Sequence, residues 1–196
     1  MPYDENFYRM YREYLQEPIV RNNHDHIFSL FESLLLPYSP CVMDLGCGVG
    51  EYATYDYSRI AYVGIDLNNT GSVTPFVQAD YLKLDFGNLL PFLPNAFISL
   101  FSIECCQSAK KKYALYNRLF STFPTVKCGL AGGFFYESRH DQETVSETGE
   151  IVSYQTIEDP SLHISNLFTE LRIHLRTPSK MFGDDVVEVW KFFVRK

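Results

Sequence analysis

The feature that most constrains this chain of 196 residues is a glycine-rich turn that directly follows a short apolar run. The stretch VMDLGCGVGEY runs from Val42 to Tyr52 and places glycines at Gly46, Gly48 and Gly50. Glycine adopts positive φ at little steric cost and has no Cβ to hold a ligand away from the backbone. Open α/β sheets bind nucleotides at such turns, at the carboxyl ends of parallel strands. The sequence therefore predicts an α/β fold with a nucleotide site at this turn.

The glycine spacing separates two kinds of nucleotide site. A dinucleotide fingerprint, GxGxxG, has its third glycine five positions after the first. Here the third glycine comes four positions after the first, and Asp44 precedes the first by two. The pattern DLGCGVG resembles motif I of the class I S-adenosylmethionine-dependent methyltransferases. The alternatives are an NAD-dependent oxidoreductase, which the spacing disfavours, and a turn that only lets a strand meet a helix.

Two further acids follow apolar runs in the expected order. Asp66 ends the run AYVGIDL and lies 20 residues after Gly46. In nucleotide-binding α/β folds an acid at about this distance hydrogen-bonds the ribose, because a carboxylate accepts from two hydroxyl groups at once. Asp80 and Tyr81 follow the run PFVQA. In the resembling family an acid there accepts from the adenine amino group; the alternative is an exposed acid that closes a strand.

The resemblance implies S-adenosylmethionine as the cofactor and S-adenosylhomocysteine as the product. Asp44 is expected to organise the turn or to reach the methionine amino group through water. The cofactor-binding residues that it implies are Asp44, Gly46, Cys47, Gly48, Asp66, Leu67, Asp80, Tyr81 and Ser102.

The order of apolar runs, together with the resemblance, predicts a Rossmann-like, mostly parallel sheet of seven strands. Helices are expected on both faces, with an antiparallel pair of strands closing the sheet. The expected strands are 41–44, 61–67, 75–79, 96–102, 126–136, 171–176 and 186–194, and the expected helices are 4–17, 27–35, 107–120 and 161–169. One domain is predicted over 1–196, with a helical cap (1–37), a cofactor-binding core (41–136) and an acceptor-side part (137–196).

Three local features refine this expectation. Pro18 either ends the first helix or opens the second. The stretch of residues 68–74 is short and polar, so we expect a loop in place of the usual crossover helix. Gly132 and Gly133 indicate a bulge or a close approach of backbone within a strand. Residues 151–157 are expected to pair with the polar stretch before them as a hairpin outside the main sheet.

The composition restricts the partners. The net charge is −7 and the one basic run is Lys110–Lys112, so we expect no nucleic-acid partner. The five cysteines are odd in number and form no CxxC, which predicts reduced thiols in a cytoplasmic protein. No apolar run reaches about 18 residues, so we expect no membrane span. No cluster has metal-ligand spacing. The oligomeric state is left open.

The reaction that the resemblance implies is methyl transfer to an oxygen or nitrogen nucleophile of a small molecule. Glu104 lies nearest the expected methyl position, and His24 precedes a helix of the cap, so both are candidate catalytic residues. For each the alternative is a structural role. The family members that methylate nucleobase amino groups carry an Asn/Asp-Pro-Pro-Tyr/Phe run that is missing here. The other hypotheses are a protein or RNA methyltransferase and a non-catalytic cofactor-binding module.

Overall fold

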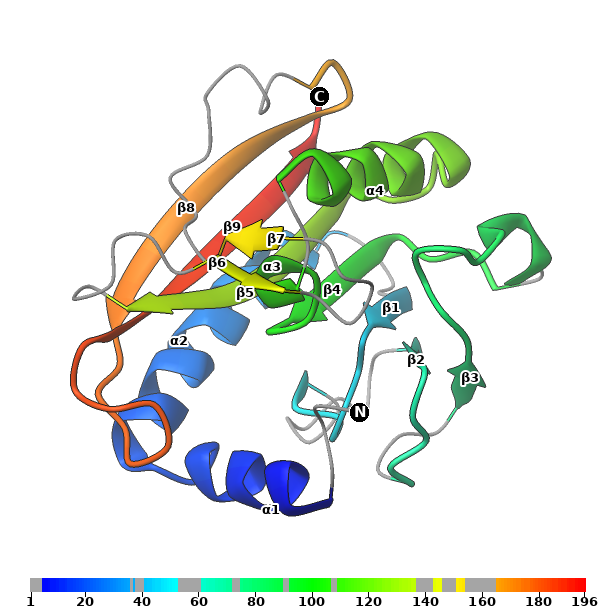
Figure 1. Cartoon of the computed structure of the whole chain (residues 1–196). Coiled ribbons are helices and arrows are strands. Elements are labelled where there is room, and N and C mark those ends of the chain that lie inside the picture. Colours follow the sequence, from blue (N-terminus) through cyan, green and yellow to red (C-terminus); the bar gives the residue numbers. More distant parts are fainter. Residues whose placement is uncertain are drawn as a thin grey trace.

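The computed structural model (Figure 1) describes residues 5–35, 37, 41–52, 61–71, 75–89, 92–106, 109–136, 143–145, 151–153 and 165–196. A seven-stranded sheet with the strand order β3-β2-β1-β4-β5-β9-β8 forms the centre of the molecule. β1 to β5 pair in parallel, whereas β9 runs antiparallel to both β5 and β8, so the predicted sheet and its closing pair are confirmed. The strands are β1 (Cys41–Leu45), β2 (Ala61–Asp66), β3 (Phe76–Gln78), β4 (Ala96–Leu100), β5 (Cys128–Tyr136), β8 (Phe168–Arg176) and β9 (Val186–Arg195).

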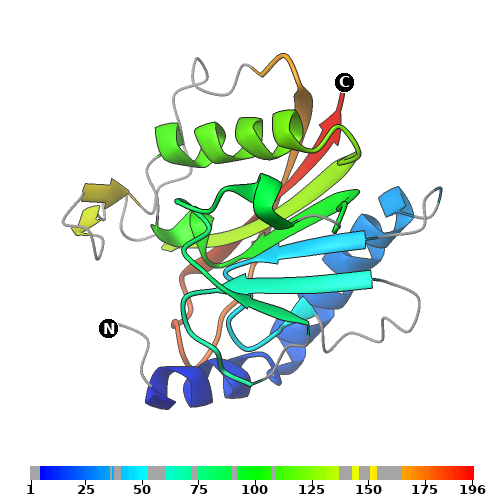
Figure 2. The same ribbon diagram turned by 90° about the vertical axis from the view of Figure 1, so that its right-hand side faces the viewer.

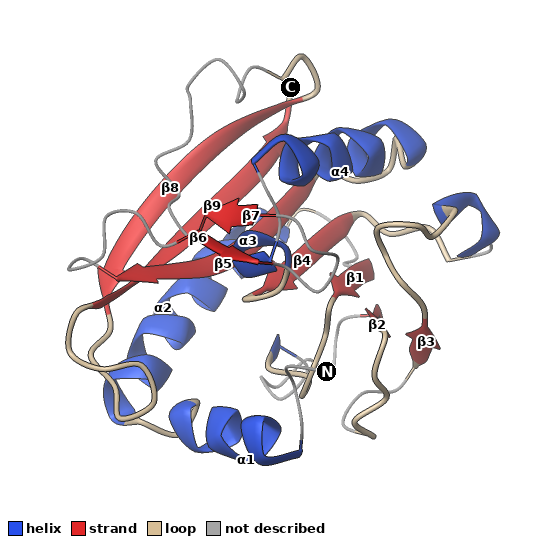
Figure 3. Ribbon diagram, in the orientation of Figure 1, coloured by secondary structure: helices blue, strands red, loops and turns tan. Residues whose placement is uncertain are grey.

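Helices precede and follow the strands of the sheet (Figure 3). They are α1 (Glu5–Tyr14), α2 (Pro18–Leu35), η2 (Phe86–Leu89), α3 (Ile103–Cys106) and α4 (Ala109–Thr122). Pro18 opens α2, where its missing N–H has no intrahelical partner to lose. The short helix α3 was not predicted. The helix expected over 161–169 is wrong in its described part, because Phe168 already pairs with Arg195 as the first residue of β8.

Alternating side chains divide the core between the two faces of the sheet. In β1, Val42 packs with α2 on one face, and Met43 and Leu45 pack with α4 on the other. Figures 1 and 2 show α2 and α4 on opposite faces, as expected for parallel strands buried on both sides. In Figure 2, α1 lies below the carboxyl ends of the parallel strands. These ends, α1 and α2 therefore enclose the region in which a ligand is expected.

Glycines let neighbouring elements approach closely at β5. A Cβ at Gly132 would lie 2.8 Å from the ring of Trp190, and one at Gly133 would lie 2.6 Å from the Cβ of Glu104. Pairing of β5 with β9 is continuous over these residues, so the close approach is confirmed and the bulge is wrong. β6 (Glu143–Val145) and β7 (Ile151–Ser153) form the expected hairpin outside the main sheet.

The described residues between β2 and β3, 67–71 and 75, contain no helix, in agreement with the expected loop. Strand β3 has three residues and pairs with β2 at the edge of the sheet. Among the described residues, no helix has both the length and the apolar character that crossing a membrane requires.

Candidate functional site

The glycine turn, residues 46–50, leaves the carboxyl end of β1 and bends back on itself. Gly46, Gly48 and Gly50 have φ values of +70°, +49° and +73°, a region that side chains other than glycine rarely adopt. The Gly46 amide donates to the carbonyl of Ile65 over 2.7 Å, and the Gly50 amide donates to the carbonyl of Cys47 over 2.7 Å. The backbone therefore presents a tight, conformationally restricted loop at the carboxyl end of β1.

A glycine is also required at position 46, because side chains that follow two other strands occupy the space where a Cβ would lie. A Cβ on this residue would lie 2.1 Å from the hydroxyl oxygen of Ser102 and 3.3 Å from the ring of Tyr81. The hydroxyl groups of Tyr81 and Ser102 are themselves hydrogen-bonded over 2.7 Å. Three of the predicted site residues, from the ends of β1, β3 and β4, thus meet at one point.

The carboxylate of Asp66 contacts the same turn. The Gly48 amide donates to Asp66 Oδ2 over 2.9 Å, and the Asn68 amide donates to Oδ1 over 3.0 Å. The Thr70 hydroxyl donates to the carbonyl of Gly48 over 2.7 Å and holds the loop after β2 against the turn. A carboxylate offers about four acceptor positions, so each oxygen keeps one for a further donor. Leu67, next to it, is 52% exposed.

Asp44 is buried at 2% exposure beneath the turn. Its Oδ2 accepts a hydrogen bond from the Tyr62 hydroxyl, whereas its Oδ1 has no hydrogen-bond partner in the described part of the chain. Burial raises the pKa of Asp44 to about 8, with a smaller contribution from Glu51 and Asp66 and an opposing one from Tyr62. A buried oxygen without a donor costs about 1–3 kcal/mol, so this atom is a place for a ligand's donor. Sequence reasoning did not find Tyr62.

In the loop that follows β3, the Asp80 carboxylate contacts residues of the same loop. Asp80 Oδ1 accepts from the Leu82 amide over 3.0 Å, and Oδ2 lies 3.1 Å from Lys83 Nζ. The Lys83 side chain is 83% exposed, so this ion pair is weak and easily replaced. Its predicted contact with an adenine amino group stays a prediction.

His24 lies in a buried cluster on the α2 face of the sheet, here called the α2-face cluster. Its Nδ1 is 2.5 Å from Glu51 Oε1 and its Nε2 is 2.8 Å from Glu188 Oε1. Burial alone would lower the pKa of His24, but the two carboxylates outweigh it and raise this pKa to about 10. The other members donate to the two carboxylates: Tyr11 to Glu51 over 2.7 Å, and Tyr14 and Trp190 to Glu188 over 2.5 and 3.1 Å. His24 is therefore a fixed imidazolium.

Glu104 lies on the opposite face, in what we call the α4-face cluster. Its Oε2 is 2.8 Å from Lys191 Nζ and 3.4 Å from Lys112 Nζ, and its Oε1 accepts from the Tyr116 hydroxyl over 2.5 Å. Burial alone would raise the pKa of Glu104, but the two ammonium groups outweigh it and lower the pKa to about 2. The catalytic roles predicted for Glu104 and His24 stay predictions, and these contacts favour the structural alternative for both.

Phe101, directly after β4, has a φ of +51°, which is strained for a bulky residue. Its amide donates to the carbonyl of Gly132 over 2.7 Å. Its ring stacks on His24 at 5.7 Å between centroids and meets Trp190 edge-on at 5.4 Å and Tyr11 at 6.3 Å. An aromatic wall thus connects the end of β4 with the α2-face cluster.

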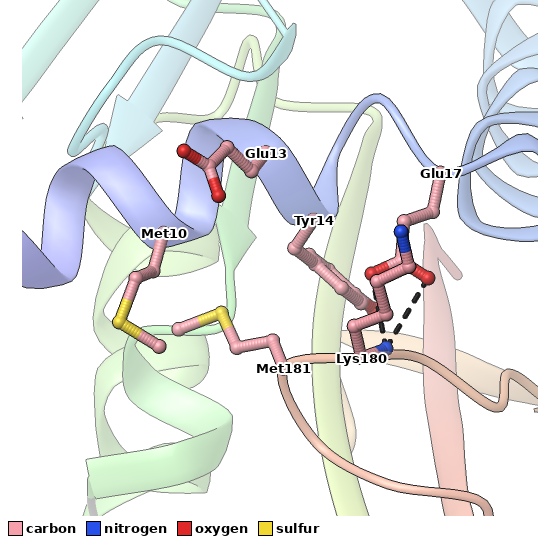
Figure 4. Close-up of a pocket in the computed structure, with 6 residues that line it drawn as sticks. All are labelled: Met10, Glu13, Tyr14, Glu17, Lys180 and Met181. Carbon is pink, nitrogen blue, oxygen red and sulfur yellow. Dashed lines mark hydrogen bonds between the residues drawn. The ribbon is translucent and has the colours of Figure 1, made fainter.

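A cavity of about 330 Å³ lies between α1 and the loop that precedes β9 (Figure 4). Its lining residues are Met10, Glu13, Tyr14, Glu17, Lys180 and Met181. The Lys180 amide donates to both carboxylate oxygens of Glu17, over 3.0 and 3.3 Å, and joins the loop to α1. The Tyr14 ring lines the cavity while its hydroxyl reaches Glu188, so one side chain contacts both the cavity and the α2-face cluster.

No protein-family model matches the sequence, and no curated protein matches it. Solved structures do match the fold, among them the N-methyltransferase NodS from Bradyrhizobium japonicum in complex with S-adenosylhomocysteine. It is 12% identical with a TM-score of 0.61, and the match covers 98% of this chain and 99% of that one. CalS10, an amino pentose methyltransferase from Micromonospora echinaspora, is 10% identical with a TM-score of 0.58 and coverage of 96% and 97%.

A 1,6-didemethyltoxoflavin-N1-methyltransferase from Burkholderia thailandensis is 15% identical, with a TM-score of 0.56 and coverage of 96% of this chain and 90% of that one. At these identities the shared property is the fold. The coverage extends over nearly the whole of each chain, including the N-terminal helices as well as the sheet.

Proposed function

We propose that this chain, which has the fold of the class I S-adenosylmethionine-dependent methyltransferases, transfers a methyl group from S-adenosylmethionine to an oxygen or nitrogen atom of a small molecule. The observation that carries this proposal is the glycine turn with its two acids. Asp66 is hydrogen-bonded to the turn and keeps acceptor positions open, and Asp44 has a buried oxygen without a donor in the described part of the chain. The matched structures that contain S-adenosylmethionine or S-adenosylhomocysteine support the same cofactor.

The residues present fit this cofactor. Asp66 is suited to the two ribose hydroxyl groups, because each of its oxygens accepts one amide hydrogen and has room for a second donor. The free oxygen of Asp44 is suited to the methionine amino group, directly or through water. We assign Asp80 and Tyr81 to the adenine end. The missing side chain of Gly48 leaves space beside the turn and lets the backbone approach the ligand.

When bound, the sulfonium of this cofactor supplies an electrophilic methyl group. The protein's contribution to an in-line displacement is chiefly the alignment of the two reactants. A protonated acceptor also needs a base, and neither predicted candidate is poised for that task near pH 7. His24 is held as an imidazolium with a pKa of about 10, and Glu104 is held as a carboxylate with a pKa of about 2. We propose that both act by fixing the walls of the site.

We place the acceptor on the side bounded by α1 and the loop before β9. The cavity of about 330 Å³ lies there and is large enough for a small molecule. Contacts lead from it to the turn: Tyr14 stacks on Tyr11 at 5.6 Å, and Tyr11 donates to Glu51, the residue that follows the turn. The names of the matched enzymes, an N-methyltransferase, an amino pentose methyltransferase and an N1-methyltransferase, support a small acceptor with a nitrogen nucleophile among the options.

Calorimetric titration tests the cofactor assignment. S-adenosylhomocysteine is expected to bind with micromolar affinity, and Asp66→Ala is expected to weaken this binding at least about tenfold because two charge-assisted hydrogen bonds to the ribose are lost. Asp184→Ala, at an exposed position that is not among the predicted cofactor contacts, is the matched control and should leave the affinity for S-adenosylhomocysteine unchanged. Binding of NADH without binding of S-adenosylhomocysteine would contradict the proposal.

A labelled-methyl assay on cell extract tests the reaction. After incubation with S-adenosylmethionine that carries a labelled methyl group, the label is expected in the small-molecule fraction. Label in protein or RNA would instead support a macromolecular acceptor. Cofactor binding without label in either fraction would support a non-catalytic module.

A further inference from the structure

The loop after β3, residues 80–84, carries two of the predicted cofactor contacts and is here called the adenine loop. The sheet itself makes few contacts that fix the position of this loop. β3 has three residues, lies at the edge of the sheet and is half-exposed, and the described residues of the connection before it include no helix that would pack against it. The position of Asp80 must therefore be fixed by other contacts.

Arg118, on α4, makes the contacts that meet this need. Its Nη1 donates to the carbonyl of Leu82 over 3.0 Å and its Nη2 donates to the carbonyl of Tyr81 over 2.8 Å. The guanidinium lies 4.8 Å from the centre of the Phe86 ring, which restricts its plane. A planar guanidinium can hold two neighbouring carbonyl groups at once, which a lysine ammonium cannot do with the same geometry.

Other contacts transmit this anchoring to Asp80. The amides of Lys83 and Leu84 donate to the Asp80 carbonyl over 3.0 and 2.8 Å, and the Leu82 amide donates to its carboxylate over 3.0 Å. The Tyr81 hydroxyl is bonded to Ser102, at the end of β4. The adenine loop is thus a tight turn whose backbone is bonded to α4 through the guanidinium and whose Tyr81 hydroxyl is bonded to Ser102. The side chains of Tyr81, Leu82 and Leu84 pack against the core beneath it.

We propose that Arg118 is a positioning residue for adenine recognition: it holds the adenine loop so that the Asp80 carboxylate meets the 6-amino group of the cofactor. This inference rests on the proposed function. Arg118 contacts the loop's backbone carbonyls, so its effect on the ligand passes through Asp80. Its loss should therefore affect the recognition of the 6-position more than the binding of the rest of the nucleoside.

A comparison of two ligands isolates this effect. S-inosylhomocysteine carries an oxygen in place of the 6-amino group of S-adenosylhomocysteine, so it presents an acceptor to the Asp80 carboxylate. In calorimetry the wild-type protein is expected to prefer S-adenosylhomocysteine at least about thirtyfold, since a site built for a donor rejects an acceptor. Arg118→Met, which keeps an apolar contact with Phe86, should weaken S-adenosylhomocysteine about tenfold and S-inosylhomocysteine less than about threefold, so the preference falls.

Arg195, the last residue of β9, offers a matched control because its guanidinium also packs against α4. It also lies over a ring, 5.1 Å from the centre of Phe120, and donates to the carbonyls of Val126 over 2.6 Å and Phe123 over 3.0 Å. It lies at the opposite, amino-terminal edge of the parallel strands, where its amide donates to the carbonyl of Lys127. Arg195→Met should lower the stability and leave the preference between the two ligands at its wild-type value.

The outcomes separate this inference from the function on which it rests. Equal weakening of both ligands in Arg118→Met, or an unchanged preference, would overturn the positioning role. A wild-type protein that binds both ligands equally would also overturn it, while leaving the proposed cofactor in place. Failure of wild-type protein to bind S-adenosylhomocysteine at all would instead overturn the proposed function. If Arg118→Met does not fold, Arg118→Lys must show the reduced preference.

Discussion

Strand β9 contributes Glu188 to one face of the sheet and Lys191 to the other, and each side chain belongs to a buried charge cluster of opposite polarity. In the α2-face cluster the imidazolium of His24 lies between carboxylates. In the α4-face cluster the carboxylate of Glu104 lies between ammonium groups. The first joins α1, α2, β9 and the residue after the glycine turn, whereas the second joins α3, α4 and β9.

In both clusters a buried charge flanked by opposite charges loses the capacity to exchange protons near neutrality. The pKa of His24 is raised to about 10 and that of Glu104 is lowered to about 2, so both move away from pH 7. Asp44 lacks such partners, and its pKa is raised to about 8, close to neutrality. The two clusters fix the framework, and the underbonded acid beneath the turn is where a ligand can be received. Three predictions test this contrast.

The largest effect is expected from Lys191→Met in the α4-face cluster. The side chains of Lys191 and Glu104 are 0% and 1% exposed, so the substitution leaves a buried carboxylate with one ammonium partner fewer. Removing one partner of a buried pair costs about 3–5 kcal/mol in the free energy of unfolding, measured by urea titration. Lys83→Met, in an exposed pair, is the control and should change it by less than about 0.5 kcal/mol. A loss below about 1 kcal/mol for Lys191→Met would remove the cluster's structural role.

The pH dependence of stability should separate the two clusters. Because the pKa of His24 is raised on folding, its contribution is complete below about pH 6.5 and is lost as the pH rises toward 10. Because the pKa of Glu104 is lowered, its contribution is complete above about pH 4.5 and is lost as the pH falls toward 2. Each slope is at most about 1.4 kcal/mol per pH unit.

The single tryptophan, Trp190, is buried and reports unfolding by its fluorescence. Asp44 affects the pH dependence of stability between about pH 4 and 8, because its pKa is raised on folding. The alkaline slope that belongs to His24 is therefore measured between pH 8 and 10. His24→Gln should flatten the alkaline slope of the free energy of unfolding against pH and leave the acid slope unchanged. Glu104→Gln should flatten the acid slope and leave the alkaline slope unchanged. If both substitutions altered the same limb of the profile, the opposite polarity assigned to the clusters would be wrong.

The smallest effect is expected from a matched pair of hydroxyl deletions. Tyr14→Phe removes a donor to Glu188, and Tyr116→Phe removes a donor to Glu104, each over 2.5 Å. A hydrogen bond to a charged group contributes about 1.5–3 kcal/mol, so both variants should lose a similar amount in urea unfolding. They should differ in methyl transfer, because Tyr14 lines the acceptor-side cavity, whereas Tyr116, on α4, packs against the opposite face of the sheet. Equal effects on turnover would contradict the placement of the acceptor beside α1.

Much of the fold follows from the sequence, because it depends on local patterns. Apolar runs, three of them followed by an acid, predicted the parallel strands. The distance from Gly46 to Asp66 predicted this acid beside the turn, where the Gly48 amide donates to it. The helix expected over 161–169 failed because Phe168 is taken into β8 by its pairing with β9, a tertiary contact that local pattern does not contain.

The two charge clusters were not predicted, because the residues that form them are far apart in the chain. His24 and Glu188 are separated by 164 positions and meet only because β9 is inserted between β5 and β8. A signal was present: Glu188 and Lys191 interrupt the apolar run VVEVWKFFV, and charges within a buried strand require partners. The identity of those partners, and of Tyr62 and Arg118, depends on packing that one sequence does not specify.

A crystal structure with S-adenosylhomocysteine bound tests the central claim most directly. We expect the ribose hydroxyl groups within hydrogen-bond distance of the Asp66 carboxylate, about 2.6–3.2 Å, the amino acid end beside Asp44, and the adenine amino group at Asp80. A nucleoside bound elsewhere, or Asp66 and Asp80 turned away from it, would contradict the proposed cofactor site.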